Sequence, residues 1–259
     1  MKSEVRSLTL ALAAVLIPGS QVFVPQASFA LGQNAQADNN IQADLQNSLK
    51  KYKTIQISVK DNVVDLEGSV NDFATKEEID KKAHRVKNVS AVRNQIQVAG
   101  AGEVSDQELQ QQIVKKLQYD RVGYGNAFNA ISVNVLNGVV TLGGNALGPV
   151  AADSAVSLAS HFPHVQDVVN DITVDPVSGF DDQSRVAVYR AIYGFPSLNK
   201  YAIDPAQPIR ITVVGGNVTL NGVVMNQADK DVAGLRANGV PGIFKVTNNL
   251  EVASSSKEK

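Results

Sequence analysis

Three short stretches of this chain share one pattern: DNVVDLEG at 61–68, NGVVTLGG at 137–144 and GGNVTLNG at 215–222. Twenty-one residues after each final glycine a second shared stretch begins: VSAVRNQIQV at 89–98, VQDVVNDITV at 165–174 and IFKVTNNLEV at 243–252. A fixed offset that recurs three times, while most side chains differ, indicates a structural unit used three times.

The spacing of apolar residues predicts the same order of elements in each unit. Apolar residues recur every four positions at the start, as at Ile41, Leu45 and Leu49, which predicts an opening helix. Two alternating stretches then flank a two-residue turn, as at Asp61-Asn62, and predict a β-hairpin. A second helix and a last strand complete the unit. The predicted fold class is α+β: tandem α-β-β-α-β units, each a three-stranded mixed sheet with two helices on one face.

Two helix starts carry a capping-box pattern, in which Ser or Thr is followed three residues later by Glu. Ser105 with Glu108 predicts the start of the opening helix of the second unit. Thr75 with Glu78 predicts the start of the second helix of the first unit.

The N-terminus has the features of a secretory signal. Lys2 and Arg6 precede a short apolar run from 8 to 17, and Ser28-Phe29-Ala30 offers small residues at a cleavage position. We therefore expect residues 1–30 to be a signal peptide cleaved after Ala30, and the mature protein to be periplasmic. A retained N-terminal anchor is the alternative.

Short segments rich in Gly, Pro and Ser separate the units, at 99–102 and 175–179. We expect a loose polar leader at 31–40, and a polar, disordered tail at 253–259. The three units are predicted at 40–98, 104–174 and 180–252.

The composition excludes several classes of function. The 259 residues include 24 Lys and Arg, 25 Asp and Glu, and no Cys. Disulfides, thiolate metal sites and thiol nucleophiles are therefore excluded. A formal net charge of −1 argues against a nucleic-acid partner, which requires a clustered positive surface.

The repeated blocks, a glycine-rich hairpin followed by a V-x-x-V-x-N-x-[IL]-x-V strand, resemble the BON domain, named for bacterial osmotically induced and nodulation proteins. The resemblance covers almost all of the chain after 40. It implies a periplasmic, non-enzymatic module without a cofactor. It also implies links to osmotic-stress protection, envelope integrity, binding of anionic phospholipid and assistance to outer-membrane protein assembly.

Six repeated residues have an expected structural role. Gly68, Gly144 and Gly222 lie where a strand ends and the chain must turn toward a helix, a position that a side chain can obstruct. Asn94, Asn170 and Asn248 fall on the same face as the core valines of the last strand. We expect each amide to bond backbone groups of the adjoining turn, or to mark a bulge.

Lys81, Lys82 and Arg85 lie off the apolar stripe of the second helix of the first unit. They are the candidate contact for anionic phospholipid head groups. The alternative is a solvated helix face on which Glu77 and Glu78 balance the positive charges.

Other candidate sites have weaker support. His161 and His164 flank Phe162-Pro163, but no further His or Cys cluster supports a metal site. The aromatic residues Tyr189, Tyr193, Phe195 and Tyr201 are expected in core and loop packing, with a partner groove as the alternative. No nucleophile elbow, metal triad or phosphate loop frames the Ser, Asp and His residues, so we expect no enzymatic activity.

The leading functional hypothesis is a periplasmic protein of three such modules that binds envelope components, including anionic phospholipid, through peripheral membrane contact. One rival is a holdase-like chaperone for unfolded or outer-membrane proteins. A second rival is an adaptor that binds other envelope proteins. The sequence does not indicate an oligomeric state.

Overall fold

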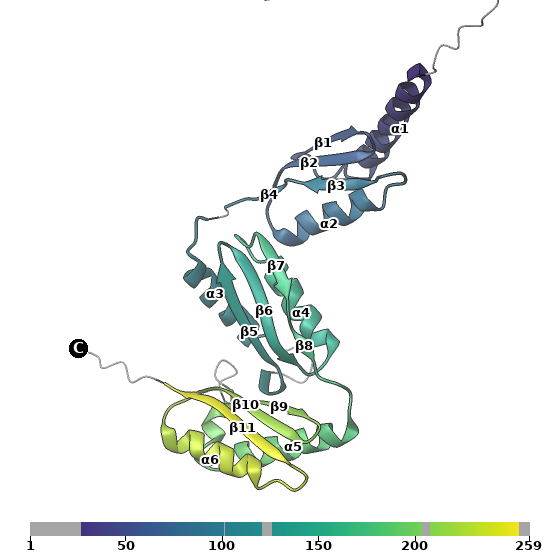
Figure 1. Cartoon of the computed structure of the whole chain (residues 1–259). Coiled ribbons are helices and arrows are strands. Elements are labelled where there is room, and N and C mark those ends of the chain that lie inside the picture. The colour runs from purple at the N-terminus through teal and green to yellow at the C-terminus, as the bar shows by residue number, and fades with distance from the viewer. Residues whose placement is uncertain (1–26, 101, 121–125, 204–207, 254–259) are drawn as a thin grey trace, which may run out of the picture.

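A computed structural model of the chain describes residues 27–100, 102–120, 126–203 and 208–253. Three similar units follow one another along an elongated molecule (Figure 1). The predicted signal peptide lies mostly outside the described residues, as does nearly all of the predicted tail at 253–259.

Each unit begins with a helix, continues through a β-hairpin and a second helix, and ends with a parallel strand. The first unit contains α1 (Ala27–Ser48), β1 (Ile55–Lys60), β2 (Val63–Val70), α2 (Phe73–His84), β3 (Ala91–Asn94) and β4 (Gln97–Val98). The second contains α3 (Asp106–Gln118), the short η1 (Asn126–Phe128), β5 (Ala130–Leu136), β6 (Val139–Ala146), α4 (Pro149–Ser160), β7 (Asp167–Asn170) and β8 (Thr173–Val174). The third contains α5 (Gly179–Tyr193), η2 (Asn199–Ala202), β9 (Arg210–Val214), β10 (Asn217–Val224), α6 (Gln227–Asn238) and β11 (Lys245–Val252).

The sheets are mixed, as predicted. The middle strand of each unit pairs antiparallel with the first strand and parallel with the last: β2 with β1 and β3, β6 with β5 and β7, and β10 with β9 and β11. In the first two units the last strand is interrupted, and β4 and β8 are its second segments. The predicted α+β class and the α-β-β-α-β order are confirmed.

Both helices of a unit bury their apolar side chains against one face of its sheet. In the first unit Val64 and Leu66 of β2 meet Ile41 and Leu45 of α1 and Ile79 of α2, and all five are essentially inaccessible to solvent. The alternate residues of β2 and every fourth residue of α1 therefore pack together in one core.

Two local predictions about the first unit are wrong. Residues 31–40, expected as a loose leader, are part of α1, and Asp38 among them holds the hairpin turn of the sheet. The cap of α2 is Asp72 and not Thr75: the Asp72 carboxylate accepts a hydrogen bond of 2.7 Å from the Thr75 amide. The aspartate three residues earlier therefore takes the role that the capping-box pattern assigned to Thr75. At α3 the predicted cap is confirmed, since Ser105 Oγ accepts from the Glu108 amide.

The closing strand keeps one register with the middle strand throughout each unit. In the first unit Val63 pairs with Ala91 and Val70 with Val98, so the same offset of 28 residues holds on both sides of the interruption. The second unit keeps this offset across its interruption, and in the third unit β11 pairs with β10 without a break. No residue is inserted, so the bulge considered for this strand is not present.

The repeated asparagine makes the same bond to a backbone amide in each unit, as the first of the two alternatives expected. Its Oδ1 accepts from the amide two residues on: Asn94 from Ile96 at 3.2 Å, Asn170 from Ile172 at 3.1 Å and Asn248 from Leu250 at 3.2 Å. The bond occupies an amide on the outermost strand, where an open N–H could pair with another chain. Asn170 is exposed, unlike its half-buried counterparts, which also donate to α2 and α6.

The repeated glycines occupy one geometric position. Gly144 has a φ of +83°, and a Cβ there would overlap the carbonyl oxygen of Ala130. Gly222 has a φ of +128°, and its Cβ would lie 2.7 Å from the carbonyl oxygen of Pro208. Both the dihedral angle and the close backbone approach therefore require glycine.

Replacing Gly144 by Ala should destabilise the second unit by roughly 2–5 kcal/mol, the sum of a left-handed conformation and an overpacked contact. Calorimetric unfolding of the full chain measures this loss. Gly148→Ala is the matched control, because its Cβ meets no atom within 4 Å and its φ is −163°. Equal melting of the two variants would contradict the assignment.

Candidate functional site

An aspartate on each opening helix binds both amides of the following hairpin turn. Asp38 accepts from the two turn residues at 2.9 and 2.8 Å, Asp106 at 2.6 and 2.9 Å, and Asp181 at 2.9 and 2.8 Å. The turn residues all have positive φ, which directs their consecutive N–H groups to one side of the turn. We call this contact the aspartate clamp. Sequence reasoning missed it, although each aspartate lies three residues before the first inward-facing position of its helix.

The clamp of the third unit is the most buried, with Asp181 only 3% exposed. Desolvation opposes ionisation of its carboxyl group, but hydrogen bonds from the amides of Gly216 and Gly215 outweigh it and lower the pKa of Asp181. The ionised carboxylate is therefore a structural element of the third unit.

The residue four positions after each clamp aspartate ties the helix to the first strand. Gln42 donates to the carbonyl of Ile57 at 2.9 Å, and Gln110 donates to that of Val133 at 2.6 Å. In the third unit this position is Arg185, which retains the tie by donating to the carbonyl of Val213 at 3.0 Å.

Arg185 also joins the third unit to the second. Its Nη2 lies 3.6 Å from Asp175 Oδ2, and both side chains are buried. Asp175 follows β8, and its other carboxylate oxygen accepts from Asn145 of β6 at 3.0 Å. Burial raises the pKa of Asp175 in spite of Asn145 and Arg185. Gln42 and Gln110 thus bond within their own units, whereas Arg185 at the corresponding position links the third unit to the second.

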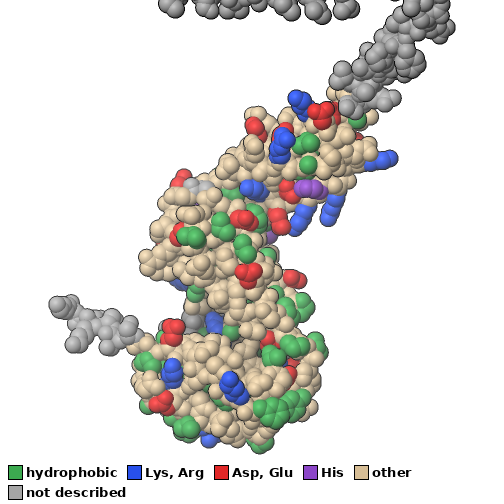
Figure 2. All heavy atoms as spheres, in the orientation of Figure 1, with side chains coloured by type: hydrophobic (Ala, Val, Ile, Leu, Met, Phe, Trp, Pro, Cys, Tyr) green, Lys and Arg blue, Asp and Glu red, His purple; other side chains and the backbone are tan. Residues whose placement is uncertain are grey.

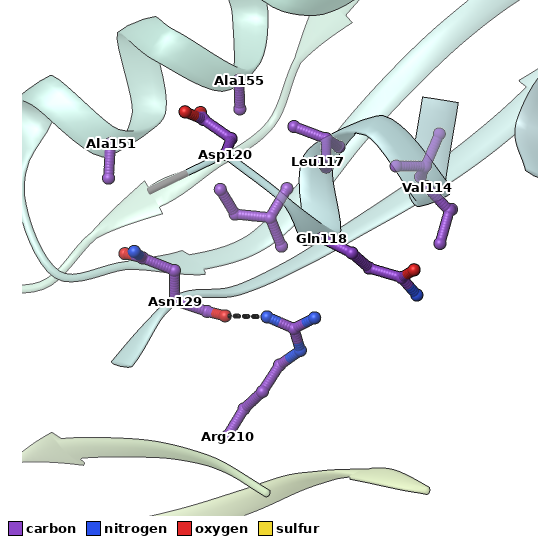
Figure 3. A pocket seen from close by; sticks show the side chains of 10 residues that line it. Val114, Leu117, Gln118, Asp120, Asn129, Ala151, Ala155 and Arg210 are labelled. Carbon is purple, nitrogen blue, oxygen red and sulfur yellow. Dashed lines mark hydrogen bonds between the residues drawn. The ribbon is translucent and has the colours of Figure 1, made fainter. Parts of the chain in front are cut away.

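Aromatic rings and a second arginine complete this joint. The ring of Phe128, the last residue of η1, lies 5.6 Å from that of Tyr189, which lies 4.6 Å from that of Tyr193. Arg210 of β9 donates to the carbonyl of Asn129 at 2.8 Å (Figure 3). Burial lowers the pKa of Arg210 from its ordinary value. Two of the aromatic residues singled out in the sequence therefore pack in the joint.

The cavity beside Arg210 is small. It measures about 50 Å³ and is lined by side chains of α3, α4 and β5 (Figure 3). One water needs about 10–15 Å³ of such space, so the cavity has room for a few water molecules. It belongs to the joint and is too small for an organic ligand.

The joint between the first and second units is simpler. Phe73 of α2 packs against the cores of both units. His164 Nδ1 lies 2.7 Å from the carbonyl oxygen of Gly100 in the connecting segment. His161 Nδ1 lies 2.8 Å from the carbonyl oxygen of Ser157, so both histidines of the HFPH stretch face backbone groups. Within the described ranges, no group of three or more His, Cys, Asp or Glu residues is placed to hold a metal ion.

The structure divides the three predicted lipid-contact residues. Lys82 pairs with Glu78 at 2.9 Å, beside Lys51 and the ring of Tyr52. The Tyr52 hydroxyl, Lys82 and Lys51 together lower the pKa of Glu78 to about 2. The Lys82 side chain is 30% exposed, against 59% for Lys81, so Lys82 is the less available of the two at the surface.

Lys81 and Arg85 remain available at the surface. Lys81 pairs with Glu77 at 2.8 Å, but both side chains are well exposed, and such helical pairs contribute only about 0.3–0.5 kcal/mol. Arg85 is exposed and has no ion pair with a described residue. The predicted trio is therefore not one uniform patch.

The chain belongs to the BON domain family, whose model matches residues 37–100, 105–176 and 197–254. This confirms three BON repeats. In the third unit the match begins after α5, although α5 holds the place of the opening helix. BON domains are known from periplasmic and envelope proteins, and the family is generally non-catalytic.

No curated protein matches the chain significantly. The solved structures that match include two of CdsD, a structural protein of the type III secretion system of Chlamydia trachomatis. The first is 16% identical and covers 84% of this chain and 94% of its own. The second is 17% identical and covers 82% and 96%. The TM-score is 0.24 in both cases, so neither supports a structural or functional argument.

Asp181→Asn should destabilise the third unit by about 2–3 kcal/mol near neutral pH, because an amide cannot accept both turn N–H groups as a carboxylate does. The contribution of the native carboxylate is complete above the unfolded pKa of about 3.9 and is lost as pH falls through the lower folded value. The difference between the variant and the native chain should therefore shrink below about pH 4.

Hydrogen exchange of the third unit across a pH series measures this effect. Asp153→Asn, which makes the same charge change at an exposed position of α4, is the control. A difference that stays constant down to about pH 2 would contradict the clamp.

Arg185→Gln restores the residue type of the other two units. It should leave the third unit folded but remove the link to Asp175, at a cost of about 3 kcal/mol for a broken buried pair. Faster proteolysis at 175–179 and a larger radius of gyration are the expected results. Arg190→Gln, on the exposed side of the same helix, is the control. An unchanged cleavage rate in Arg185→Gln would show that the pair does not hold the joint.

Proposed function

We propose that this chain is an exported, non-catalytic protein of the cell envelope that binds anionic phospholipid reversibly through its first unit. Support comes from four exposed cations that follow the two helices of that unit, here called the cationic face: Lys50 and Lys53 after α1, and Arg85 and Lys87 after α2. None of these four forms an ion pair with another residue in the described part of the chain. Figure 2 shows Lys and Arg side chains on the side of the first unit where α2 runs.

The charge of this face supports weak, reversible attachment. Each cation near an anionic membrane contributes about 1 kcal/mol, so four contribute about 4 kcal/mol, which corresponds to a millimolar dissociation constant. Lys81 adds to this when it leaves Glu77, at little cost. Lys82 contributes less, because it is committed to Glu78.

A protein attached by the cationic face binds at the membrane surface and does not cross the bilayer. No helix among the described residues is long and apolar enough to cross a bilayer. A role in envelope integrity or osmotic stress is part of this proposal, and membership of the BON family and the expected signal peptide at 1–30 support it. Cleavage after Ala30 would fall within α1 as it stands in the whole chain.

Sedimentation with vesicles of phosphatidylglycerol and phosphatidylcholine tests the proposal. The full chain should bind the mixed vesicles, should not bind phosphatidylcholine alone, and should be released at about 1 M salt, where the Debye length is about 3 Å. Arg85→Glu with Lys87→Glu should weaken binding by at least about tenfold, because reversing each charge replaces attraction by repulsion.

Lys115→Glu with Lys116→Glu is the matched control, since it makes the same charge change on α3 of the second unit. Lys82→Gln should have a smaller effect than Arg85→Gln. Equal loss in both double variants would refute the cationic face, and binding of phosphatidylcholine alone would refute electrostatic attachment. The holdase alternative predicts suppressed aggregation of a denatured client without lipid binding.

A further inference from the structure

The third unit exposes large apolar side chains where it meets the second. Val177 in the connection before α5 is fully exposed, at 101% of its reference area, and Phe180 and Val186 of α5 are 50% and 41% exposed. Phe244, before β11, is 76% exposed. Figure 2 shows hydrophobic side chains gathered along this side of the junction and of the third unit. Contiguous exposed apolar surface on a soluble domain marks an interaction site.

A groove adjoins these residues. It has a volume of about 260 Å³ and is lined by Phe128, Leu147, Pro176, Val177, Asp182, Arg185 and Val186. Val177 and Val186 belong both to its lining and to the exposed surface, so groove and surface are continuous. Pockets for whole small molecules measure about 300–1,000 Å³. The groove is smaller than these, which favours individual side chains of a protein partner as occupants.

The repeats show that the fold does not require these apolar residues. Counting from the clamp aspartates, Phe180 corresponds to Ala37 and Ser105. By the same count Val186 corresponds to Ala43 and Gln111.

Phe244 is likewise particular to the third unit. Its amide donates to the hairpin carbonyl of Gly216, as the amides of Ser90 and Gln166 do in the other units. Two units thus fold with smaller or polar residues at all three positions. The apolar surface is therefore an addition to the fold, and it requires another explanation.

The charge at the groove selects the chemistry of the partner. Asp182 lines the groove, and its side chain is 63% exposed although its Oδ1 pairs with Arg185 Nη1 at 2.5 Å. Arg185 is 3% exposed and is also paired with Asp175, so this one cation faces two carboxylates. The group therefore carries a net negative charge and presents it to solvent through Asp182, which repels an anionic lipid head group and attracts Lys or Arg.

We propose that this groove, together with Phe180 and Phe244, binds a segment of a protein partner that presents large apolar side chains beside a Lys or Arg. The apolar side chains occupy the groove and the exposed surface, and the cation lies against Asp182. This site is distinct from the cationic face of the first unit.

Fluorescence anisotropy with a labelled soluble peptide, in which Leu alternates with Ser around a central Arg, tests the proposal on the full chain. Val177→Ser with Val186→Ser should weaken binding by about tenfold or more, since both side chains line the groove. A twin peptide with Glu in place of Arg should bind more weakly to the native chain. Asp182→Asn should abolish that preference, and a melting curve shows whether this variant retains its fold.

Leu235→Ser is the matched control, because Leu235 is a 72% exposed apolar residue of α6 outside the groove. Peptide binding should also be unchanged in Arg85→Glu with Lys87→Glu, so the lipid proposal can fail while this one stands. Equal weakening in Leu235→Ser, or no saturable binding of either peptide, would overturn the proposal. Loss of phosphatidylglycerol vesicle binding in the Val177 and Val186 variant would assign the surface to a membrane instead.

Discussion

The aspartate clamp is the contact on which each unit depends. A carboxylate on the opening helix holds the two consecutive amides of the hairpin turn, and in doing so it fixes the helix against one end of the sheet. The hairpin can then present its alternate residues to the helix, so the apolar stripe and the apolar face meet in one core. Because the turn amides of a two-residue hairpin point the same way, a single carboxylate satisfies both.

The aspartate clamp is the same in all three units, while other positions differ between them. These differences give the three units different contacts. The residue four after the clamp is Gln42 in the first unit and Gln110 in the second, whereas Arg185 in the third reaches across to the preceding unit. Units two and three are thereby joined by buried polar groups and by tilted aromatic rings in contact. The first unit is joined chiefly by Phe73 and a connecting segment, and it carries the exposed cations.

Much of the fold was predictable because it depends on local rules. The two periods of apolar residues, the turn residues and the positive-φ glycines all act within a few positions of the chain. The functional surfaces were less predictable. Lys81, Lys82 and Arg85 look equivalent in sequence, yet Lys82 pairs with Glu78 beside Tyr52, which comes from the segment between α1 and β1. The clamp itself escaped notice because its partners are separated by 23 to 35 residues.

The sequence by itself determined the repeated unit, its class and the positions where only glycine fits, since periodicity and backbone conformation are properties of short segments. The tertiary structure alone decided which charges are free and which are paired, because pairing depends on distances between segments far apart in the chain. It also decided that Arg185 meets Asp175, and that Val177, Phe180 and Val186 lie exposed beside one groove. Those arrangements arise only when two units are placed side by side.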